Sequence, residues 1–223
     1  MTRASRSVAG QPDRPDLPDR TQLGSPGALL VIVSGPSGVG KDTVIEALRA
    51  HPGVHPYRYV VTCTTRPRRS YESDGVHYHF LTTEAFLRLR DEGELLEANE
   101  VHGHWYGTPR AGVRSGLVAG EDVILKIDVQ GAAVVKQKVP EALLVFIVPP
   151  SLEDLFQRLR ARATETADEL DVRQRNAAVE LARQSDYDVV IVNETGQVER
   201  TAAHIDEVIR AAKAEHPDHR TRV

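Results

Sequence analysis

The chain of 223 residues is 40% apolar and 27% charged, which provides enough apolar surface for a buried core and excludes wholesale disorder. Its 28 Lys and Arg against 32 Asp and Glu give a net charge of -4, so we do not expect nucleic acid to bind to a general basic surface. A single cysteine, Cys63, excludes an internal disulfide and zinc sites built on cysteine pairs.

The first 27 residues differ in composition from the rest of the chain. They interleave Pro, Arg and Asp with few apolar residues and show no helical or strand period, so we expect residues 1–27 to form a disordered tail. A regulatory or partner-binding arm is the alternative. Residues 216–223 have the same character and are expected to form a second tail, which leaves 28–215 as one folded domain.

Five short apolar, β-branched runs mark the folded part of the chain. Such runs suit strands that are buried on both faces of a parallel sheet. They are LLVIVS (29–34), YVVTC (59–63), VILKID (123–128), LLVFIV (143–148) and DVVIVN (188–193). Because helical segments separate them, the sequence predicts an α/β sandwich around a central five-stranded parallel sheet, with ligands at the carboxyl ends of the strands.

Two helices carry clear local signals. Ser151 and Asp154 follow a Pro-Pro pair and indicate a helix N-terminus with a capping box. In the last helix, apolar residues at helical spacing form one stripe. They are Ile205, Val208, Ile209 and Ala212.

Two irregular stretches interrupt the alternation of strands and helices. Residues 62–108 hold several aromatic residues, short strand-like pieces and one helix near 83–92. Residues 160–172 interrupt a helical region. We interpret both stretches as lobes that are inserted into one α/β core.

The motif GPSGVGK (35–41) follows the first apolar run and precedes the helical sequence DTVIEALRA. This context indicates a phosphate-binding loop, and an ordinary glycine-rich turn is the alternative. Glycines let the backbone turn so that successive N–H groups point at one anion, while Lys41 reaches the terminal phosphates. The residues expected to hold the nucleoside triphosphate are Gly35, Pro36, Ser37, Gly38, Val39, Gly40, Lys41, Asp42 and Thr43.

One residue departs from the phosphate-loop pattern. The pattern has Ser or Thr after the lysine as a hydroxyl ligand for Mg²⁺, whereas this chain has Asp42. A carboxylate is a competent Mg²⁺ ligand, so we hypothesise that Asp42 binds the ion directly or through water. The alternative is a carboxylate that complements the helix dipole.

Several dispersed motifs resemble those of guanylate kinases, in the family's order and over about residues 28–215. They are TTRPRRSYESDGVHYHF (64–80), ELLEANEVHGHWYGTP (94–109), IDVQGA (127–132), VPPS (148–151) and RLRARATET (158–166). The resemblance implies a three-layer P-loop kinase sandwich in which the first insertion, at 62–108, binds GMP and the second, at 160–172, is a lid. It also implies phosphoryl transfer from ATP to GMP with Mg²⁺, in purine nucleotide metabolism.

The resemblance assigns the GMP site largely to the first insertion. Arg66 and Arg69 flank Pro67 and suit bidentate binding of the acceptor phosphate. Glu97 matches the residue that accepts the two adjacent donors of guanine, which adenine does not offer. The other residues that the resemblance places around GMP are Thr62, Tyr78, Tyr106, Thr108 and Asp128.

Asp128 ends the run VILKID, where it is expected to meet the Mg²⁺ shell or the acceptor nucleotide. Family members commonly carry a second acidic residue two positions earlier, and this chain has Lys126 there. We hypothesise that Lys126 is paired with Asp42, so that a basic residue on the strand compensates the acidic residue in the loop.

Four cations are expected to stabilise the transferring phosphoryl group. By resemblance they are Lys41 and three arginines of the lid region, Arg158, Arg162 and Arg173. Arginines on a closing lid supply charge and exclude water only when both substrates are bound. Asn193, which ends the last apolar run, is similar to a residue near the adenine.

Two other functions remain open at this point. A ribose 1,5-bisphosphate phosphokinase shares the scaffold and is favoured by Asp42 alone, against Glu97, Tyr106 and Thr108. A non-catalytic guanylate-kinase-like module that binds phosphorylated peptides would not need Lys41 or the lid arginines. No apolar run reaches the roughly 18–20 residues that span a bilayer and no secretory signal is evident, so we expect a cytoplasmic enzyme, monomeric or homodimeric, without a nucleic-acid or membrane partner.

Overall fold

A computed structural model describes residues 24–51, 56–101, 103–161 and 167–223. Its centre is a parallel sheet of five strands in the order β2-β7-β1-β8-β9. The strands are β1 (Leu30–Ser34), β2 (Arg58–Tyr59), β7 (Val123–Lys126), β8 (Leu143–Val148) and β9 (Val189–Val192). The predicted α/β sandwich with a five-stranded parallel sheet is confirmed.

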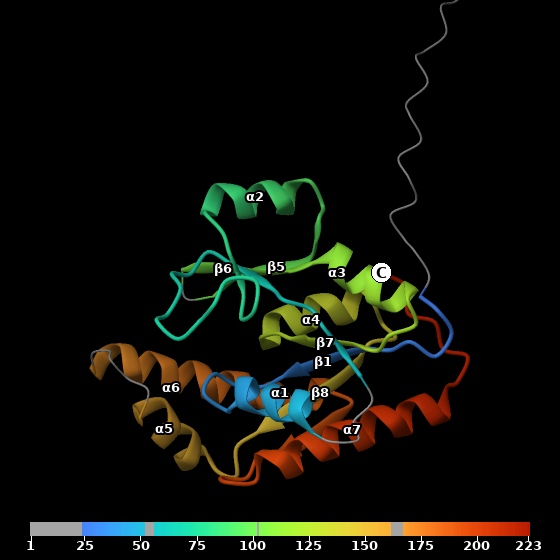
Figure 1. Cartoon of the computed structure of the whole chain (residues 1–223). Coiled ribbons are helices and arrows are strands. Elements are labelled where there is room, and N and C mark those ends of the chain that lie inside the picture. The colour runs from blue at the N-terminus through green and yellow to red at the C-terminus, as the bar shows by residue number, and fades with distance from the viewer. Residues whose placement is uncertain (1–23, 52–55, 102, 162–166) are drawn as a thin grey trace, which may run out of the picture.

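Helices cover both faces of this sheet (Figure 1). On one face, α1 (Lys41–Ala50), α5 (Leu152–Ala161) and α7 (Val198–Glu215) share a core with Val31 and Val33. On the other face, α3 (Arg110–Val118) and α4 (Val129–Lys138) share a core with Leu30 and Ile32. Alternate residues of β1 therefore enter opposite cores, as expected for a strand that is buried on both sides.

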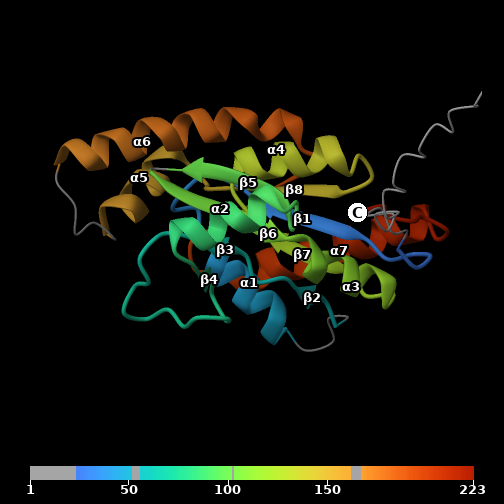
Figure 2. The same ribbon diagram turned by 90° about the horizontal axis from the view of Figure 1, so that it is seen from above.

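A smaller lobe lies over one face of the core, with α2 on its outer side (Figures 1 and 2). Its four strands have the order β4-β3-β6-β5. Its elements are β3 (Cys63–Thr64), β4 (His79–Phe80), α2 (Thr83–Asp91), β5 (Leu95–Val101) and β6 (His104–Pro109). After β8, α5 is followed by α6 (Ala167–Leu181), which packs against it, and by the 3-10 helix η1 (Ala182–Asp186).

The apolar run 59–63 was expected to form one strand of the central sheet, and this prediction is wrong. The run is divided between the two sheets, because Tyr59 pairs with Ile124 of β7 whereas Cys63 pairs with Gly107 of β6. One apolar stretch therefore leaves the core and enters the lobe, and it joins the two sheets covalently.

Both predicted helix signals are confirmed. The Asp154 N–H donates to the Ser151 hydroxyl over 3.0 Å at the start of α5. On α7, Ile205 and Ile209 are fully buried, while Val208 and Ala212 pack at the edge of the same core. No helix in the described part of the chain is both long and apolar enough to cross a membrane.

Residues 216–223, expected to form a tail, are instead packed against residues 24–28. The prediction of a disordered tail over 1–27 is therefore wrong for residues 24–27, and residues 1–23 lie outside the described residues. The Gly24 N–H donates to the Thr221 carbonyl over 2.8 Å, and the Thr221 hydroxyl donates to the Ala28 carbonyl over 3.1 Å. Thr221 is fully buried and Val223 is 5% exposed. Neighbouring residues are polar, so this burial leaves no periodic pattern in the sequence.

Deletion of residues 221–223 is expected to lower the free energy of unfolding by about 2–4 kcal/mol, because it removes the buried Val223 side chain and the hydrogen bonds of Thr221. Urea unfolding measures this change. The exposed neighbour provides the control, since Arg222→Ala should change stability by less than about 0.5 kcal/mol. An unchanged unfolding midpoint in the deletion variant would contradict a stabilising contact.

Candidate active site

The phosphate loop lies between β1 and α1 at the carboxyl edge of the central sheet. Three of its glycines have positive φ angles, which are 146° at Gly35, 86° at Gly38 and 100° at Gly40. A Cβ atom at Gly35 would lie 2.3 Å from the Ile147 carbonyl oxygen on β8. Gly35 is therefore required both by its backbone angle and by the close approach of the neighbouring strand.

Lys41 begins α1, and its side chain folds back over the loop. The ammonium donates to the Gly35 carbonyl over 2.6 Å and to the Pro36 carbonyl over 3.0 Å. Burial lowers the pKa of Lys41, against the opposing charges of Glu180, Asp42 and Asp128. A buried ammonium next to converging backbone N–H groups is suited to an anionic ligand.

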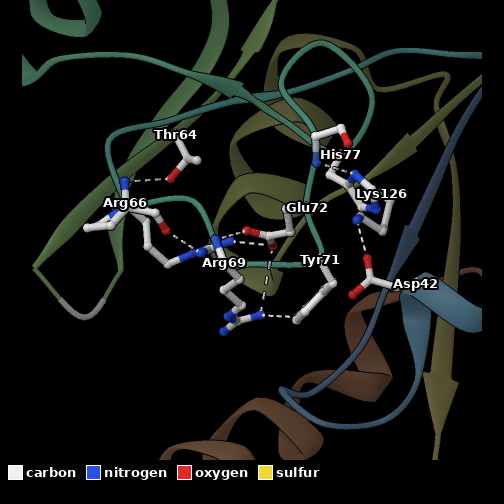
Figure 3. A network of polar contacts seen from close by, with 10 residues as sticks. Asp42, Thr64, Arg66, Arg69, Tyr71, Glu72, His77 and Lys126 are labelled. Carbon is white, nitrogen blue, oxygen red and sulfur yellow. Dashed lines mark hydrogen bonds and ion pairs between the residues drawn. The ribbon is translucent and has the colours of Figure 1, made fainter.

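The predicted contact between Asp42 and Lys126 is present. The Lys126 ammonium donates to the Asp42 carboxylate, across 84 residues of sequence (Figure 3). The Asp128 carboxylate caps α4, accepting from the N–H groups of Gln130 and Gly131 over 2.8 and 3.0 Å. Within the ranges that the structure describes, no group of three or more His, Cys, Asp or Glu residues could hold a metal ion.

A buried carboxylate that the sequence analysis missed organises the two loop arginines. The Arg66 guanidinium donates to Glu72 over 2.7 Å, and the Arg69 N–H donates to the same carboxylate over 2.8 Å (Figure 3). Although burial alone would raise it, these donors hold the pKa of Glu72 below its ordinary value. Glu72 thus fixes the loop, while the Arg69 side chain remains half exposed.

Arg66 and Arg69 form one side of the lobe, here called the cationic wall, and aromatic rings lie between this wall and the core. Tyr78 and Tyr106 make an edge-to-face contact with ring centroids 6.0 Å apart. The Arg66 guanidinium lies 5.7 Å from the Tyr78 centroid, and the Lys126 ammonium lies 5.1 Å from it. Tyr78 therefore lies between Arg66 and Lys126 at the end of β7.

Glu97 lies on β5, apart from the loop arginines, and its side chain is buried. Its carboxylate accepts hydrogen bonds of 2.7 Å from the Thr108 hydroxyl on β6 and of 2.7 Å from the Asn99 amide. The side chain lies against α4, where a Cβ atom at Gly131 would be 3.1 Å from it. Burial raises the pKa of Glu97 to about 7, with Asp128 contributing in the same direction.

Two further predicted residues hold the phosphate loop from outside. The Arg158 guanidinium donates to the carbonyls of Val39 and Asn193 over 3.0 and 3.1 Å. The Asn193 amide donates to the same Val39 carbonyl over 2.9 Å. Glu180 of α6, which was not predicted, accepts from the Ser37 N–H over 2.8 Å. These contacts join α5, α6 and β9 to the loop.

The other predicted residues lie in different surroundings. Thr62 lines a pocket that also contains Asp42, Lys126 and His77. Arg173 lies half-buried on α6. Arg162 lies outside the described residues.

Glu72, Asn99 and Glu180 could not be found by spacing alone. Glu72 lies within the motif 64–80 but its function depends on how the loop folds back. Asn99 lies two residues after Glu97 on the same strand. Side chains alternate between the two faces of a strand, and this alternation is the one sequence signal that places both residues on the same face. Nothing in the sequence indicates that Glu180 contacts Ser37.

A glycine-rich loop between a buried parallel strand and a helix, with a lysine and a facing cationic lobe, defines a P-loop nucleotide kinase. The family model for guanylate kinase matches residues 28–212. Curated guanylate kinases are similar over most of their length. That of Mycobacterium sp. strain MCS is 50% identical over 166 residues, covering 74% of this chain and 83% of the relative.

The guanylate kinase of Symbiobacterium thermophilum is 45% identical over 190 residues, covering 85% of this chain and 88% of the relative. The crystal structure of guanylate kinase from Anaplasma phagocytophilum has a TM-score of 0.67 and 32% identity, covering 85% of this chain and 88% of that one. The chain belongs to the guanylate kinase family.

Replacement of Gly35 by alanine is expected to lower the free energy of unfolding by about 3 kcal/mol or more and to abolish nucleotide binding, because the new Cβ clashes with the β8 backbone. Chemical unfolding and ATP titration measure the two effects. Gly196→Ala is the matched control, since Gly196 also has a positive φ, 78°, but open space around it. Equal losses in both variants would show that strain alone, without the clash, accounts for the effect.

Proposed function

We propose that the protein transfers the γ-phosphoryl group of ATP to GMP and forms ADP and GDP. The observation that carries this proposal is the buried Glu97–Thr108 pair in a lobe that faces a phosphate loop. A phosphate loop alone implies only a nucleoside triphosphate, whereas this pair supplies a reason for guanine as the acceptor base.

Guanine presents two adjacent donors, its N1–H and its exocyclic amine. An ionised carboxylate is an acceptor only, so Glu97 matches both donors at once. Adenine offers an acceptor at the ring position where guanine has N1–H and would leave the buried carboxylate unpaired. Hydrogen-bonding sites of this kind discriminate between substrates by about 10⁴–10⁵. Asn99, which contacts the same carboxylate, orients it for the base.

The acceptor phosphate fits the cationic wall of the lobe. Arg66 and Arg69 supply guanidinium donors for bidentate contacts, and Tyr78 supplies a hydroxyl. Glu72 holds Arg66 over 2.7 Å and makes a longer ion pair of 4.0 Å with Arg69, whose side chain is half exposed. Base and phosphate would thus be bound at two ends of one small sheet.

The donor phosphates fit the loop and Lys41, and Asp128 and Asp42 would hold the Mg²⁺ that accompanies ATP. Mg²⁺ in such sites keeps several waters and takes one or two protein carboxylates together with substrate phosphates. Asp128 and Asp42 fit that need at the carboxyl edge of the sheet, Asp42 once its contact with Lys126 opens. The ion supplies charge neutralisation between the phosphates when it is bound.

Closure of the lobes would bring further positive charges next to the phosphoryl group that is transferred. Phosphoryl transfer needs positioning and electrostatic stabilisation more than covalent chemistry from the protein. Arg158 already contacts the loop, Arg162 belongs to the segment expected to act as a lid, and Arg173 directly follows that segment. The N–H groups of the loop, Lys41 and these arginines would then surround the phosphoryl group on several sides.

A coupled ADP-release assay with ATP and Mg²⁺, offering GMP, AMP and ribose 1,5-bisphosphate in parallel, tests the proposed reaction. We expect turnover with GMP at least about 10³-fold above that with AMP. Turnover with ribose 1,5-bisphosphate, the alternative that Asp42 favours, would contradict the proposal. Turnover with none of the three would favour a non-catalytic binding module.

The raised pKa of Glu97 predicts a pH dependence for base recognition. The carboxylate form binds guanine, and its fraction rises as pH increases through about 7, so affinity should be about tenfold weaker at pH 6 than at its plateau. Guanosine is the appropriate ligand, because it has no phosphate that titrates near the same pH. Binding from pH 5.5 to 8.5 measures the profile.

Glu97→Gln should weaken guanosine binding and remove this pH dependence together. Glu100→Gln is the matched control, since Glu100 lies on the same strand with its side chain exposed. A pH profile that persisted in Glu97→Gln would assign the titration to another group.

A further inference from the structure

Lys126 places a positive charge between the phosphate loop and the acceptor lobe. It is the last residue of β7 and pairs in register with Val33, just before the loop. Its ammonium donates to Asp42 at the start of α1 and lies 5.1 Å from the Tyr78 centroid. Figure 3 shows the Lys126–Asp42 contact beside the network of Arg66, Arg69 and Glu72.

The ammonium remains charged in this position. Burial opposes the charge and Arg49 repels it, but Tyr78 and Asp42 hold the pKa of Lys126 above its ordinary value. Lys126 is only 21% exposed, whereas Asp42 is 61% exposed. The carboxylate can therefore be hydrated when the contact opens, whereas the mostly buried ammonium then requires another anion as its partner.

Tyr78 is flanked by two cations that come from different parts of the fold. Arg66 belongs to the loop after β3 and Lys126 to the central sheet. Burial raises the pKa of the Tyr78 hydroxyl, and both cations oppose this rise. An anion that the Tyr78 hydroxyl and Arg66 bind would lie within reach of the flexible lysine side chain.

We propose that Lys126 binds the phosphate of the acceptor nucleotide, and that Asp42 holds its ammonium until this phosphate arrives. The proposal rests on the proposed GMP site. It adds a contact from the core to those from the lobe, so that the acceptor phosphate is joined directly to the strand beside the phosphate loop. Exchange of Lys126 from Asp42 to the phosphate also releases the carboxylate toward the donor side.

The test compares the binding of GMP and guanosine, without ATP, at fixed ionic strength. Lys126→Gln should weaken GMP binding by about 10–100-fold, the range for one lost charge-assisted hydrogen bond, and leave guanosine binding unchanged. Equal weakening of both ligands, or none, would overturn the proposal. In a separate titration with ATP, an effect on ATP binding alone would place the ammonium on the donor and would overturn the proposal as well.

Two variants control for loss of charge and of folding. Lys136 lies on α4 and is ion-paired with Asp188 over 3.2 Å. Lys136→Gln removes this lysine and should leave the GMP-to-guanosine affinity ratio unchanged. Lys126→Arg keeps a cation and should retain GMP binding within about threefold. If Lys126→Gln does not fold, Lys126→Arg serves as the test. A folded Lys126→Arg variant that lost GMP binding would contradict the proposal, because the cation at position 126 would still be present.

Asp42→Asn tests the restraint on the ammonium. Removal of an exposed ion-pair partner frees Lys126, so GMP affinity should rise by about two- to fivefold while guanosine affinity stays constant. Unchanged or weaker GMP binding would overturn the role of Asp42. Wild-type protein that bound neither GMP nor guanosine would instead refute the proposed function, which separates the two failures.

Discussion

The parallel pairing of β1 with β7 and β8 is the constraint on which the rest of the site depends. One register sets Val33 beside Lys126 and Ser34 beside Phe146, so β1 and β7 end within one residue of each other while β8 runs two residues farther, to Val148. Everything that follows these strands meets at one edge, including the phosphate loop, the Lys126 ammonium and the helix cap made by Asp128. Hydrophobic cores on both faces hold that register, because a slip by one residue would move every side chain of β1 to the wrong core.

Two ionisable side chains of the site, Lys41 and Glu97, are buried where their charged forms are disfavoured, and ligands of complementary charge or hydrogen bonding would stabilise those forms. Lys41 is held where burial disfavours its charge, while Glu97 is held where burial disfavours the opposite charge. Each is retained by hydrogen bonds to fixed neighbours, and the proposed reaction assigns Lys41 to the polyphosphate and Glu97 to the base. Local destabilisation of this kind is typical of functional sites and is offset by the cores beneath.

Much of the fold and site could be predicted from the sequence, because the signals were local. Apolar runs, the capping pair Ser151–Asp154 and the glycine spacing each act within a few residues, and the resemblance placed Glu97 beside Thr108. The division of the run 59–63 could not be predicted, since only distant partners on β6 and β7 separate its two ends. Glu72 was missed because its contacts arise from a loop without a period, and Thr221 because one buried residue among polar neighbours has no pattern.

The contact between Gly24 and Thr221 brings the two ends of the described chain together (Figure 1). Both ends lie near the start of β1, whereas the phosphate loop follows its carboxyl end, about 16 Å farther along the strand. A domain or surface linker fused before Gly24 or after Val223 would therefore leave the approach of nucleotides open. The same proximity makes residues 24–223 suited to circular permutation, with a short linker between Gly24 and Val223 and new ends opened in a loop of the lobe.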